Sequence, residues 1–287
     1  MANFTRHEFI QRHLACPACH MLVTRTDNGY QCPNCGTAFE IKEDIPVMVM
    51  PLQRKSLKGL EQKKAVFKSR TLQNKIRQMW VPPSPSLNVA GGAGRVIQAM
   101  PQGAAILEVG SGIRRLREDV INLEVDLFAN VDIVATGDEI PFPDSTFDLV
   151  ISQAVLEHVQ EPQLVVVDML RVLKPGGQIY VEIPFLQGYH ADPNDYQRYT
   201  LRGIEHLLRA ADKIDSGVAV GPSSALVWII REYVPLWFPQ FLRAPVRLLT
   251  AWITTPFKYL DWLIARRPDA HRIASGLYYW GRKPVAP

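Results

Sequence analysis

Short, nearly continuous runs of apolar residues recur through the middle of the chain. One run, at residues 106–109, ends at a turn that contains two glycines. Further runs occupy residues 119–126, 131–136, 147–153 and 177–185. Runs of this length with few polar interruptions predict strands that are buried on both faces. Together with the helix predicted at 162–173, they indicate an α/β fold with a mostly parallel sheet covered on both sides.

The turn after the first of these strands is a candidate binding site. It comprises Gly110, Ser111 and Gly112, and Glu108 precedes it. Glycine has no Cβ and accepts positive φ, so backbone N–H groups in such a turn can approach a ligand closely. Ligands of open parallel sheets bind at the carboxyl ends of the strands. We therefore expect a nucleotide-like ligand here, with a tight turn that binds nothing as the alternative.

The pattern changes after residue 200. It predicts a helix at 201–211, a strand near 214–220 and a final strand at 274–283. The intervening helical insertion, 223–267, combines aliphatic and basic residues with four tryptophans. Amphipathic helices of this composition suit a membrane interface. A helical cover over the active site and a dimer surface remain open as alternatives.

All four cysteines lie near the N-terminus. They form two pairs with C-x-x-C spacing, Cys16 with Cys19 and Cys32 with Cys35. Each pair supplies two of the four sulfurs that tetrahedral zinc coordination requires. A hairpin between the two pairs would bring all four sulfurs together. Two disulfides are the alternative, which a reducing compartment disfavours. The zinc would be structural, because four thiolates leave no open position.

A basic segment separates the cysteines from the apolar runs. Residues 54–77 contain nine Lys and Arg residues and one acidic residue, Glu61. Such a stripe suits phosphates of nucleic acid or anionic lipid, and a solvated helix face is the alternative. The proline-rich segment 81–85 and the glycine-rich segment 91–94 interrupt regular secondary structure and mark the start of the main domain. We therefore expect three parts, which are a zinc ribbon at 1–50, a basic helical linker at 51–95 and the main domain at 96–287.

Bulk composition narrows the class only slightly. The 287 residues, 47% of them hydrophobic, suffice for one large core and a small appended domain. The net charge of +4 permits an anionic partner without requiring one. No apolar run reaches membrane-spanning length, and residues 1–14 are too polar for a secretory signal. We expect a cytoplasmic protein, with peripheral contact at the inner membrane face through 223–267 as an open alternative.

Five motifs in the main domain occur in the order of a known family. They are Glu108-Val-Gly-Ser-Gly112, Ile140-Pro-Phe142, Phe147-Asp-Leu-Val150, Leu156-Glu-His-Val159 and Arg171-Val-Leu-Lys-Pro-Gly-Gly177. As a set they resemble the class I S-adenosylmethionine (SAM) dependent methyltransferases, a family that includes quinone-biosynthesis enzymes. The resemblance covers roughly residues 100–200. It implies a Rossmann-like sheet, SAM as cofactor and methyl transfer as the activity.

The N-terminal part resembles a second family. The sequences around both cysteine pairs, followed by Ile45-Pro-Val-Met48, are similar to the small zinc-ribbon proteins that activate translation-related methyltransferases. That family usually has glycine where Asp44 stands here. The resemblance implies a zinc ribbon closed by a last strand at 45–50.

The first resemblance also implies which residues hold SAM. Glu108, Gly110, Ser111 and Gly112 form the first contact region. Glu124, at the end of the second strand, would accept hydrogen bonds from the ribose hydroxyls. Relatives place an acid at the position of Thr136 to bind the adenine amino group, which leaves Asp138 as a displaced candidate. Gln153 would lie beside the methyl donor. Arg114 or Arg115 could pair with the carboxylate of SAM, or both could be solvated.

A polar, aromatic-rich loop at 187–199 follows the fifth strand, where this family receives its methyl acceptor. We predict His190 and Asp195 as catalytic residues, because either could serve as a general base for a hydroxyl or amine acceptor. A plain surface loop is the alternative. His158 is assigned a packing role or a role at a helix start. We expect a small-molecule or lipid-linked acceptor, methylated on oxygen or nitrogen. RNA methylation and a non-catalytic scaffold are the rival functions.

Overall fold

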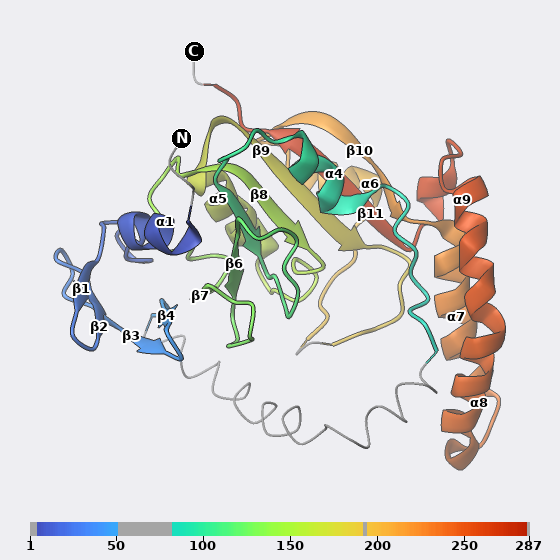
Figure 1. Ribbon diagram of the computed structural model, residues 1–287. Coiled ribbons are helices and arrows are strands. Elements are labelled where there is room, and N and C mark those ends of the chain that lie inside the picture. The colour runs from blue at the N-terminus through green and yellow to red at the C-terminus, as the bar shows by residue number, and fades with distance from the viewer. Residues whose placement is uncertain (1–4, 51–81, 192–193, 286–287) are drawn as a thin grey trace.

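The computed structural model describes residues 5–50, 82–191 and 194–285. It contains one eleven-stranded sheet with the order β1-β2-β3-β4-β7-β6-β5-β8-β9-β11-β10 (Figure 1). The ribbon contributes β1 (Thr24–Thr26), β2 (Gly29–Gln31), β3 (Ala38–Lys42) and β4 (Ile45–Val47). The main domain contributes β5 (Ile106–Val109), β6 (Val120–Glu124), β7 (Ile133–Val134), β8 (Phe147–Gln153), β9 (Leu173–Pro184), β10 (Asp212–Val220) and β11 (Gly276–Arg282).

The main-domain part of the sheet is mostly parallel. Strands β7, β6, β5, β8 and β9 run parallel to one another. Strand β11 is antiparallel to both β9 and β10, between which it lies. The predicted Rossmann-like sheet is therefore confirmed, as is the strand delayed until after the helical insertion.

Helices cover both faces of the sheet because its central strands are apolar on both sides. Ile106 faces one side, where it packs with α4 (Gly92–Ala99). Leu107 and Val109 belong to the opposite cluster, together with side chains of α5 (Pro162–Val172) and α6 (Leu201–Leu207). Successive residues of a strand point to opposite faces, so β5 belongs to both clusters.

Two boundaries differ from the expectation. The chain enters β9 at Leu173, directly after α5, and Gly176 and Gly177 lie inside the pairing of β8 with β9, where the register is irregular. Gly176 has φ +79°, which allows this irregular passage. Helix α6 ends at Leu207, four residues before the predicted boundary. Between β5 and β6 there is no helix, in agreement with the short connection.

The ribbon is continuous with the main sheet. Val47 of β4 pairs in parallel with Val134 of β7, and the Met48 N–H donates to the Val134 carbonyl at 2.7 Å. The ribbon also includes α1 (Arg6–His13), whose Phe9 ring lies 5.8 Å from the Phe147 ring. Asp44 has φ +65° in the turn between β3 and β4, so the position does adopt the conformation that favours glycine. The basic segment 54–77 lies outside the described residues.

The insertion forms a helical arm at the edge of the molecule opposite the ribbon (Figure 1). It consists of α7 (Pro222–Leu236), α8 (Gln240–Thr254), η1 (Thr255–Leu260), α9 (Asp261–Ile264) and η2 (Ala270–Arg272). Helix α8 runs directly into η1, and the Thr255 hydroxyl donates to the Ala251 carbonyl at 2.6 Å. Among the described helices, none is long and apolar enough to cross a membrane.

Candidate active site

The predicted cofactor residues meet at the carboxyl edge of the parallel strands. Val109, the last residue of β5, lies opposite Leu123 of β6 and Ser152 of β8. The turn 110–112 therefore lies beside the ends of both neighbouring strands. Gln153 is the last residue of β8 and pairs with Glu182 of β9.

The glycine turn is held by hydrogen bonds to β6. The N–H groups of Gly110 and Ser111 donate to the Leu123 carbonyl at 2.9 and 3.2 Å. The Gly112 N–H donates to the Glu124 carboxylate at 2.7 Å. In contrast to the expectation, all three N–H groups thus have partners within the chain. Glu124 fixes the turn and at the same time places its carboxylate beside it.

Gly110 is required by its surroundings. Its φ is +75°, and a Cβ at this position would lie 2.2 Å from Cγ2 of Val155. Gly112 also has positive φ, +59°, but a Cβ there would meet no atom within 4 Å. The first glycine therefore serves packing, and the second leaves space at the strand ends.

Several buried polar atoms near this turn have no hydrogen-bond partner in the described part of the chain. They include one carboxylate oxygen of Glu108 and the hydroxyls of Ser111 and Ser152. Burial raises the pKa of Glu108 to about 7, and the positive charges of Arg114 and Arg115 oppose this shift. Buried polar groups normally have partners, so these atoms fit a ligand that carries both donors and acceptors. The cationic amino group and the hydroxyls of SAM meet that requirement.

Arg115 and Asp138, also predicted as cofactor contacts, have other neighbours. Arg115 forms a bidentate pair with Asp132, at 3.0 Å for both contacts, and donates to the carbonyls of Val120 and Asn130. It therefore stabilises the loops around β6 and is not free for a SAM carboxylate, whereas Arg114 is exposed. Asp138 lies in the turn after β7, next to a glycine that packs against Val109.

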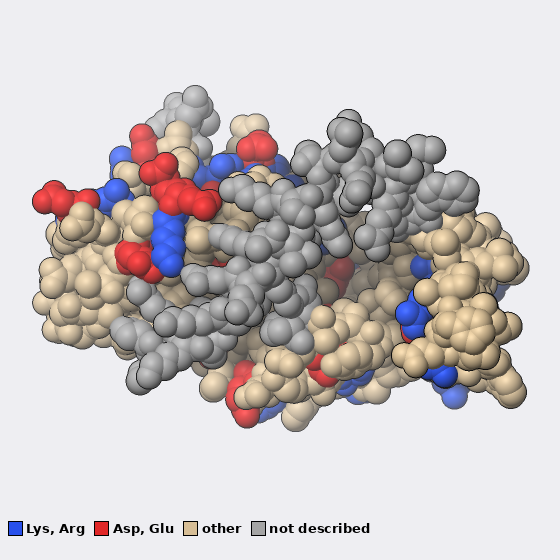
Figure 2. All heavy atoms as spheres, turned by 90° about the horizontal axis from the view of Figure 1, so that it is seen from below, with Lys and Arg blue, Asp and Glu red and all other residues tan. Residues whose placement is uncertain are grey.

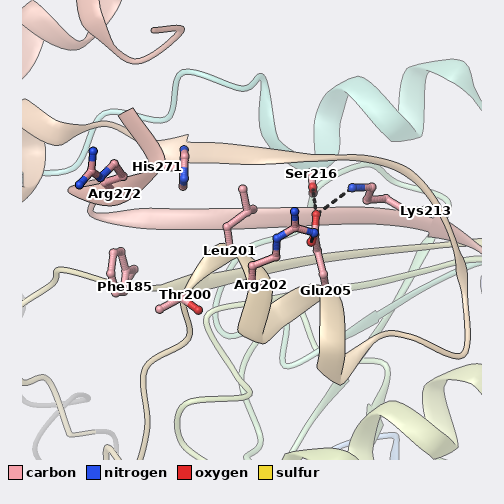
Figure 3. A pocket seen from close by; sticks show the side chains of 9 residues that line it. All are labelled: Phe185, Thr200, Leu201, Arg202, Glu205, Lys213, Ser216, His271 and Arg272. Atoms are coloured by element: carbon pink, nitrogen blue, oxygen red, sulfur yellow. Dashed lines mark hydrogen bonds and ion pairs between the residues drawn. The ribbon is translucent and has the colours of Figure 1, made fainter. Parts of the chain in front are cut away.

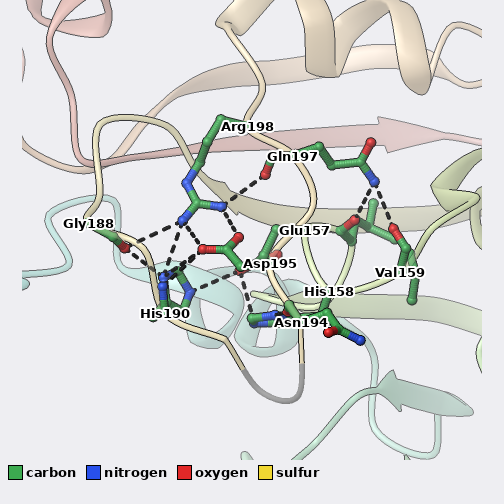
Figure 4. A network of polar contacts seen from close by, with 10 residues as sticks. Glu157, His158, Val159, Gly188, His190, Asn194, Asp195, Gln197 and Arg198 are labelled. Carbon is green, nitrogen blue, oxygen red and sulfur yellow. Dashed lines mark hydrogen bonds and ion pairs between the residues drawn. The ribbon is translucent and has the colours of Figure 1, made fainter.

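The acceptor loop brings His190 and Asp195 together (Figure 4). The backbone N–H of His190 donates to the Asp195 carboxylate at 2.9 Å, and the imidazole Nδ1 lies 3.8 Å from the same carboxylate. Arg198 forms a bidentate ion pair with Asp195. Hydrogen bonding to Arg198 lowers the pKa of Asp195 to about 2, so this carboxylate is a weak base and a good anchor for the loop.

Glu157 lies beside His190 of the acceptor loop, and the sequence analysis did not include it among the site residues. Its side chain is fully buried, and neither carboxylate oxygen has a hydrogen-bond partner in the described part of the chain. His190 Nε2 lies 3.6 Å from Glu157 Oε1, and His158 Nε2 lies 3.7 Å from the same oxygen. Interaction with Glu157 raises the pKa of His190, and burial opposes that shift. The sequence feature that could have indicated this site is the acidic residue directly before His158.

His158 also fixes the acceptor loop. Its Nδ1 contacts the Asn194 carbonyl at 2.5 Å. Gln197 donates to the carbonyls of Leu156 and Val159 at 3.0 and 2.9 Å. These contacts bind the loop after β9 to the segment after β8, which agrees with a positioning role for His158.

The four cysteines form the predicted cluster. Cys16 Sγ lies 3.6 Å from Cys35 Sγ, and Cys19 Sγ lies 3.4 Å from Cys32 Sγ. All four sulfurs lie within 4.8 Å of one another, and none of the four cysteines forms a disulfide. Four thiolates at this spacing fit tetrahedral zinc.

Comparison with known proteins identifies the central part of the chain. Residues 87–181 match a family model described as a methyltransferase domain. The chain contains a methyltransferase domain. A ubiquinone/menaquinone biosynthesis C-methyltransferase of Pasteurella multocida is 38% identical over 103 residues, which are 33% of this chain and 38% of that protein. An uncharacterized methyltransferase of Schizosaccharomyces pombe is 39% identical over 59 residues, 21% of each chain.

The matched region is thus well under half of each of these relatives. Among solved structures, the 1,6-didemethyltoxoflavin-N1-methyltransferase of Burkholderia thailandensis is 12% identical, with a TM-score of 0.45 over 88% of this chain and 98% of that chain. The cysteine-containing ribbon and the helical arm lie outside the segment matched by the methyltransferase family.

A hollow of about 640 Å³ lies elsewhere in the main domain, between α6, the start of β10 and η2 (Figure 3). Its lining includes Arg202, Lys213 and Arg272. Glu205, also in the lining, binds Lys213 at 2.8 Å and Arg202 at 3.0 Å. None of the predicted cofactor or catalytic residues lines it, and its acid, Glu205, already has partners.

Proposed function

We propose that the protein is a SAM-dependent methyltransferase that acts on an oxygen or nitrogen atom of a polar, lipid-linked acceptor. The observation that carries this proposal is the set of buried polar atoms of Glu108, Ser111 and Ser152 at the glycine turn that have no hydrogen-bond partner among the described residues. These atoms lie at the carboxyl edge of the sheet, where this class of fold binds ligands.

The residues divide into two groups by their place at this edge. The first group, which comprises Glu108, Ser111, Gly112, Glu124 and Gln153, would hold SAM. SAM supplies an electrophilic sulfonium methyl group, and the protein's task is to align the acceptor with it and exclude water. The second group is the loop of His190 and Asp195. A hydroxyl or amine acceptor must lose a proton, and His190 is the loop residue suited to assist, because Asp195 is held as an anion by Arg198.

The helical arm supports an acceptor carried by a lipid. A Cβ on Gly188, in the acceptor loop, would lie 3.5 Å from the side chains of Trp228 and Glu232 of α7, so the arm borders the loop. Its outer surface carries large exposed apolar side chains, among them Trp237 at 74% and Phe241 at 78%. Figure 2 shows this end of the molecule largely free of charge, with scattered basic residues. Such a surface suits the interface of an anionic membrane, at its cytoplasmic face.

We also propose that the four cysteines bind structural zinc. Four thiols at these distances contribute little to stability without a metal. A zinc ion bound by all four would connect the segment after α1 to the rest of the ribbon.

Calorimetric titration with S-adenosylhomocysteine, the product of SAM after methyl transfer, tests the function. The test variant is Gly112→Leu, because the new side chain would enter the open space at the turn. Gly103→Leu is the matched control, since Gly103 also has positive φ and no atom within 4 Å of a Cβ, but lies away from the site. We expect binding by the native protein and the control, and at least tenfold weaker binding by Gly112→Leu.

The two rival functions give different results. No binding of S-adenosylhomocysteine by the native protein would favour a non-catalytic scaffold. Retention on RNA that falls steeply with salt would favour RNA methylation.

A further inference from the structure

We propose that Glu157, His158 and His190 bind a divalent metal ion at the acceptor side of the site. His158 Nε2 and His190 Nε2 lie 3.7 and 3.6 Å from the same oxygen, Oε1 of Glu157. The three ligand atoms lie within 4.8 Å of one another. Ligands at about 2.1 Å from one ion in a tetrahedral arrangement are separated by about 3.4 Å, close to these distances.

The contacts of the two imidazole Nδ1 atoms bear on this role. His158 Nδ1 contacts the Asn194 carbonyl, and His190 Nδ1 contacts the Gly188 carbonyl at 3.0 Å. A carbonyl oxygen only accepts, so Nδ1 of His158 carries the proton and its Nε2 presents the lone pair. The Nδ1 of His190 also lies 3.3 Å from the Arg198 guanidinium, which only donates, so His190 presents an Nε2 lone pair in the tautomer whose Nδ1 donates to Gly188. Histidine ligands of metals usually donate their other ring N–H to a carbonyl or carboxylate in this way.

The burial of Glu157 provides an independent argument. Its side chain is fully buried, and both of its oxygens lack a hydrogen-bond partner among the described residues. A buried carboxylate without partners is costly unless a cation compensates it. The Arg198 guanidinium, which also belongs to this network, pairs with both oxygens of Asp195, so its charge is balanced there (Figure 4). A metal ion would compensate Glu157 and use both Nε2 lone pairs.

The donor set indicates the kind of ion. Two imidazoles and one carboxylate suit zinc, cobalt or manganese, whereas magnesium and calcium prefer oxygen ligands alone. Three protein ligands also leave at least one coordination position open. This arrangement differs from the ribbon cluster, where four sulfurs fill the coordination shell.

The open position suggests a role, which rests on the proposed function. An acceptor hydroxyl bound to the ion would have a lower pKa and would release its proton to solvent. The oxygen would then form a bond to the methyl group as the bond from carbon to sulfur breaks, with its electron pair remaining on sulfur. His190 would thus assist deprotonation through the ion rather than by taking the proton itself.

Metal content and manganese binding test the site without any activity measurement. The full-length protein is first saturated with zinc and dialysed, and its zinc is measured by elemental analysis. Two zinc ions per chain, or one zinc ion followed by binding of one Mn²⁺ in a calorimetric titration, are the supporting results. One zinc ion and no Mn²⁺ binding up to millimolar concentration would overturn the proposal.

Variants assign the ion to these residues. Glu157→Gln, His158→Gln and His190→Gln should each remove the second zinc or weaken Mn²⁺ binding at least tenfold. His271→Gln is the matched control, because its Nδ1 also contacts a carbonyl, at 2.9 Å, but it does not belong to the cluster. Second-site binding that survives in all three variants would contradict the assignment. Binding of S-adenosylhomocysteine by the same variants shows that they fold and keeps this test separate from that of the proposed function.

Discussion

The Glu124 carboxylate accepts a 2.7 Å hydrogen bond from the backbone N–H of Gly112. The residue that the family resemblance assigns to the ribose thus also holds the glycine turn in place. Its two roles can be separated by substitution, because an amide retains an acceptor oxygen but loses the charge.

Glu124→Ala should lower the free energy of unfolding by about 1–3 kcal/mol, because the Gly112 N–H loses its partner. Glu124→Gln should retain most of that stability and still weaken S-adenosylhomocysteine binding. Denaturant titration and calorimetry measure the two effects. Glu118→Ala is the control, since its side chain is 94% exposed. Unchanged stability in Glu124→Ala would show that the hydrogen bond is unimportant for the turn.

Gly110→Ala should be strongly destabilising. A side chain at φ +75° costs about 1–2 kcal/mol, and the contact with Val155 adds overpacking of about 1–3 kcal/mol. Adding Val155→Ala should recover the second contribution but not the first. Gly103→Ala, with φ +82° and open space, isolates the backbone contribution. Equal unfolding midpoints for Gly110→Ala and Gly103→Ala would contradict the steric explanation.

Glu108 should make stability depend on pH. Its pKa is raised from 4.5 to about 7 by burial, so between these values the folded protein holds a proton that the unfolded chain has released. Its contribution to the free energy of unfolding therefore falls as pH rises from about 4.5 to about 7, by about 3 kcal/mol, and is constant above. Glu108→Gln should remove this slope, whereas Glu118→Gln should retain it. Urea titrations at several pH values measure it, and an unchanged slope in Glu108→Gln would refute the assignment.

Removal of zinc should destabilise the methyltransferase domain as well as the ribbon. The two share the pairing of Val47 with Val134 and the contact of Phe9 with Phe147. A chelator, or Cys16→Ser, should lower the melting temperature of the whole chain and accelerate hydrogen exchange at the Met48 amide. A melting transition of the methyltransferase domain that is indifferent to chelation would show that the ribbon is energetically independent.

The helical arm should bind anionic vesicles. Trp237→Glu combined with Phe241→Glu should reduce retention in a vesicle sedimentation assay at least tenfold, because charges replace two exposed apolar anchors. Val167→Glu, at a position on α5 that is 64% exposed, is the matched control and should bind like the native protein. If the native protein fails to sediment with vesicles, the membrane proposal is wrong, and a measurement of oligomeric state tests the dimer alternative.

The sequence was informative where the determinants are local. Strand β8 has the bounds read from its apolar run, and α5 ends one residue before its expected boundary. The cysteine spacing likewise indicated the four-sulfur cluster. In each case the pattern of neighbouring residues decides the structure.

Relationships between distant segments could not be predicted in the same way. The pairing of Val47 with Val134 joins residues 87 positions apart, and the local sequence of either strand does not indicate which strand it pairs with. The proximity of Glu157 to His190 also depends on how the loops after β8 and β9 meet. The glycine turn shows a third limit, because the resemblance indicated a ligand site but not that β6 would accept the hydrogen bonds of its N–H groups.

The position of β4 beside β7 has a consequence for self-association. An uncovered edge strand offers unpaired N–H and C=O groups to any other chain, which is a common origin of aggregation. Here the ribbon covers the β7 edge from within the same polypeptide. If zinc loss released the ribbon, that edge would become available, so metal depletion could cause intermolecular strand addition as well as loss of stability.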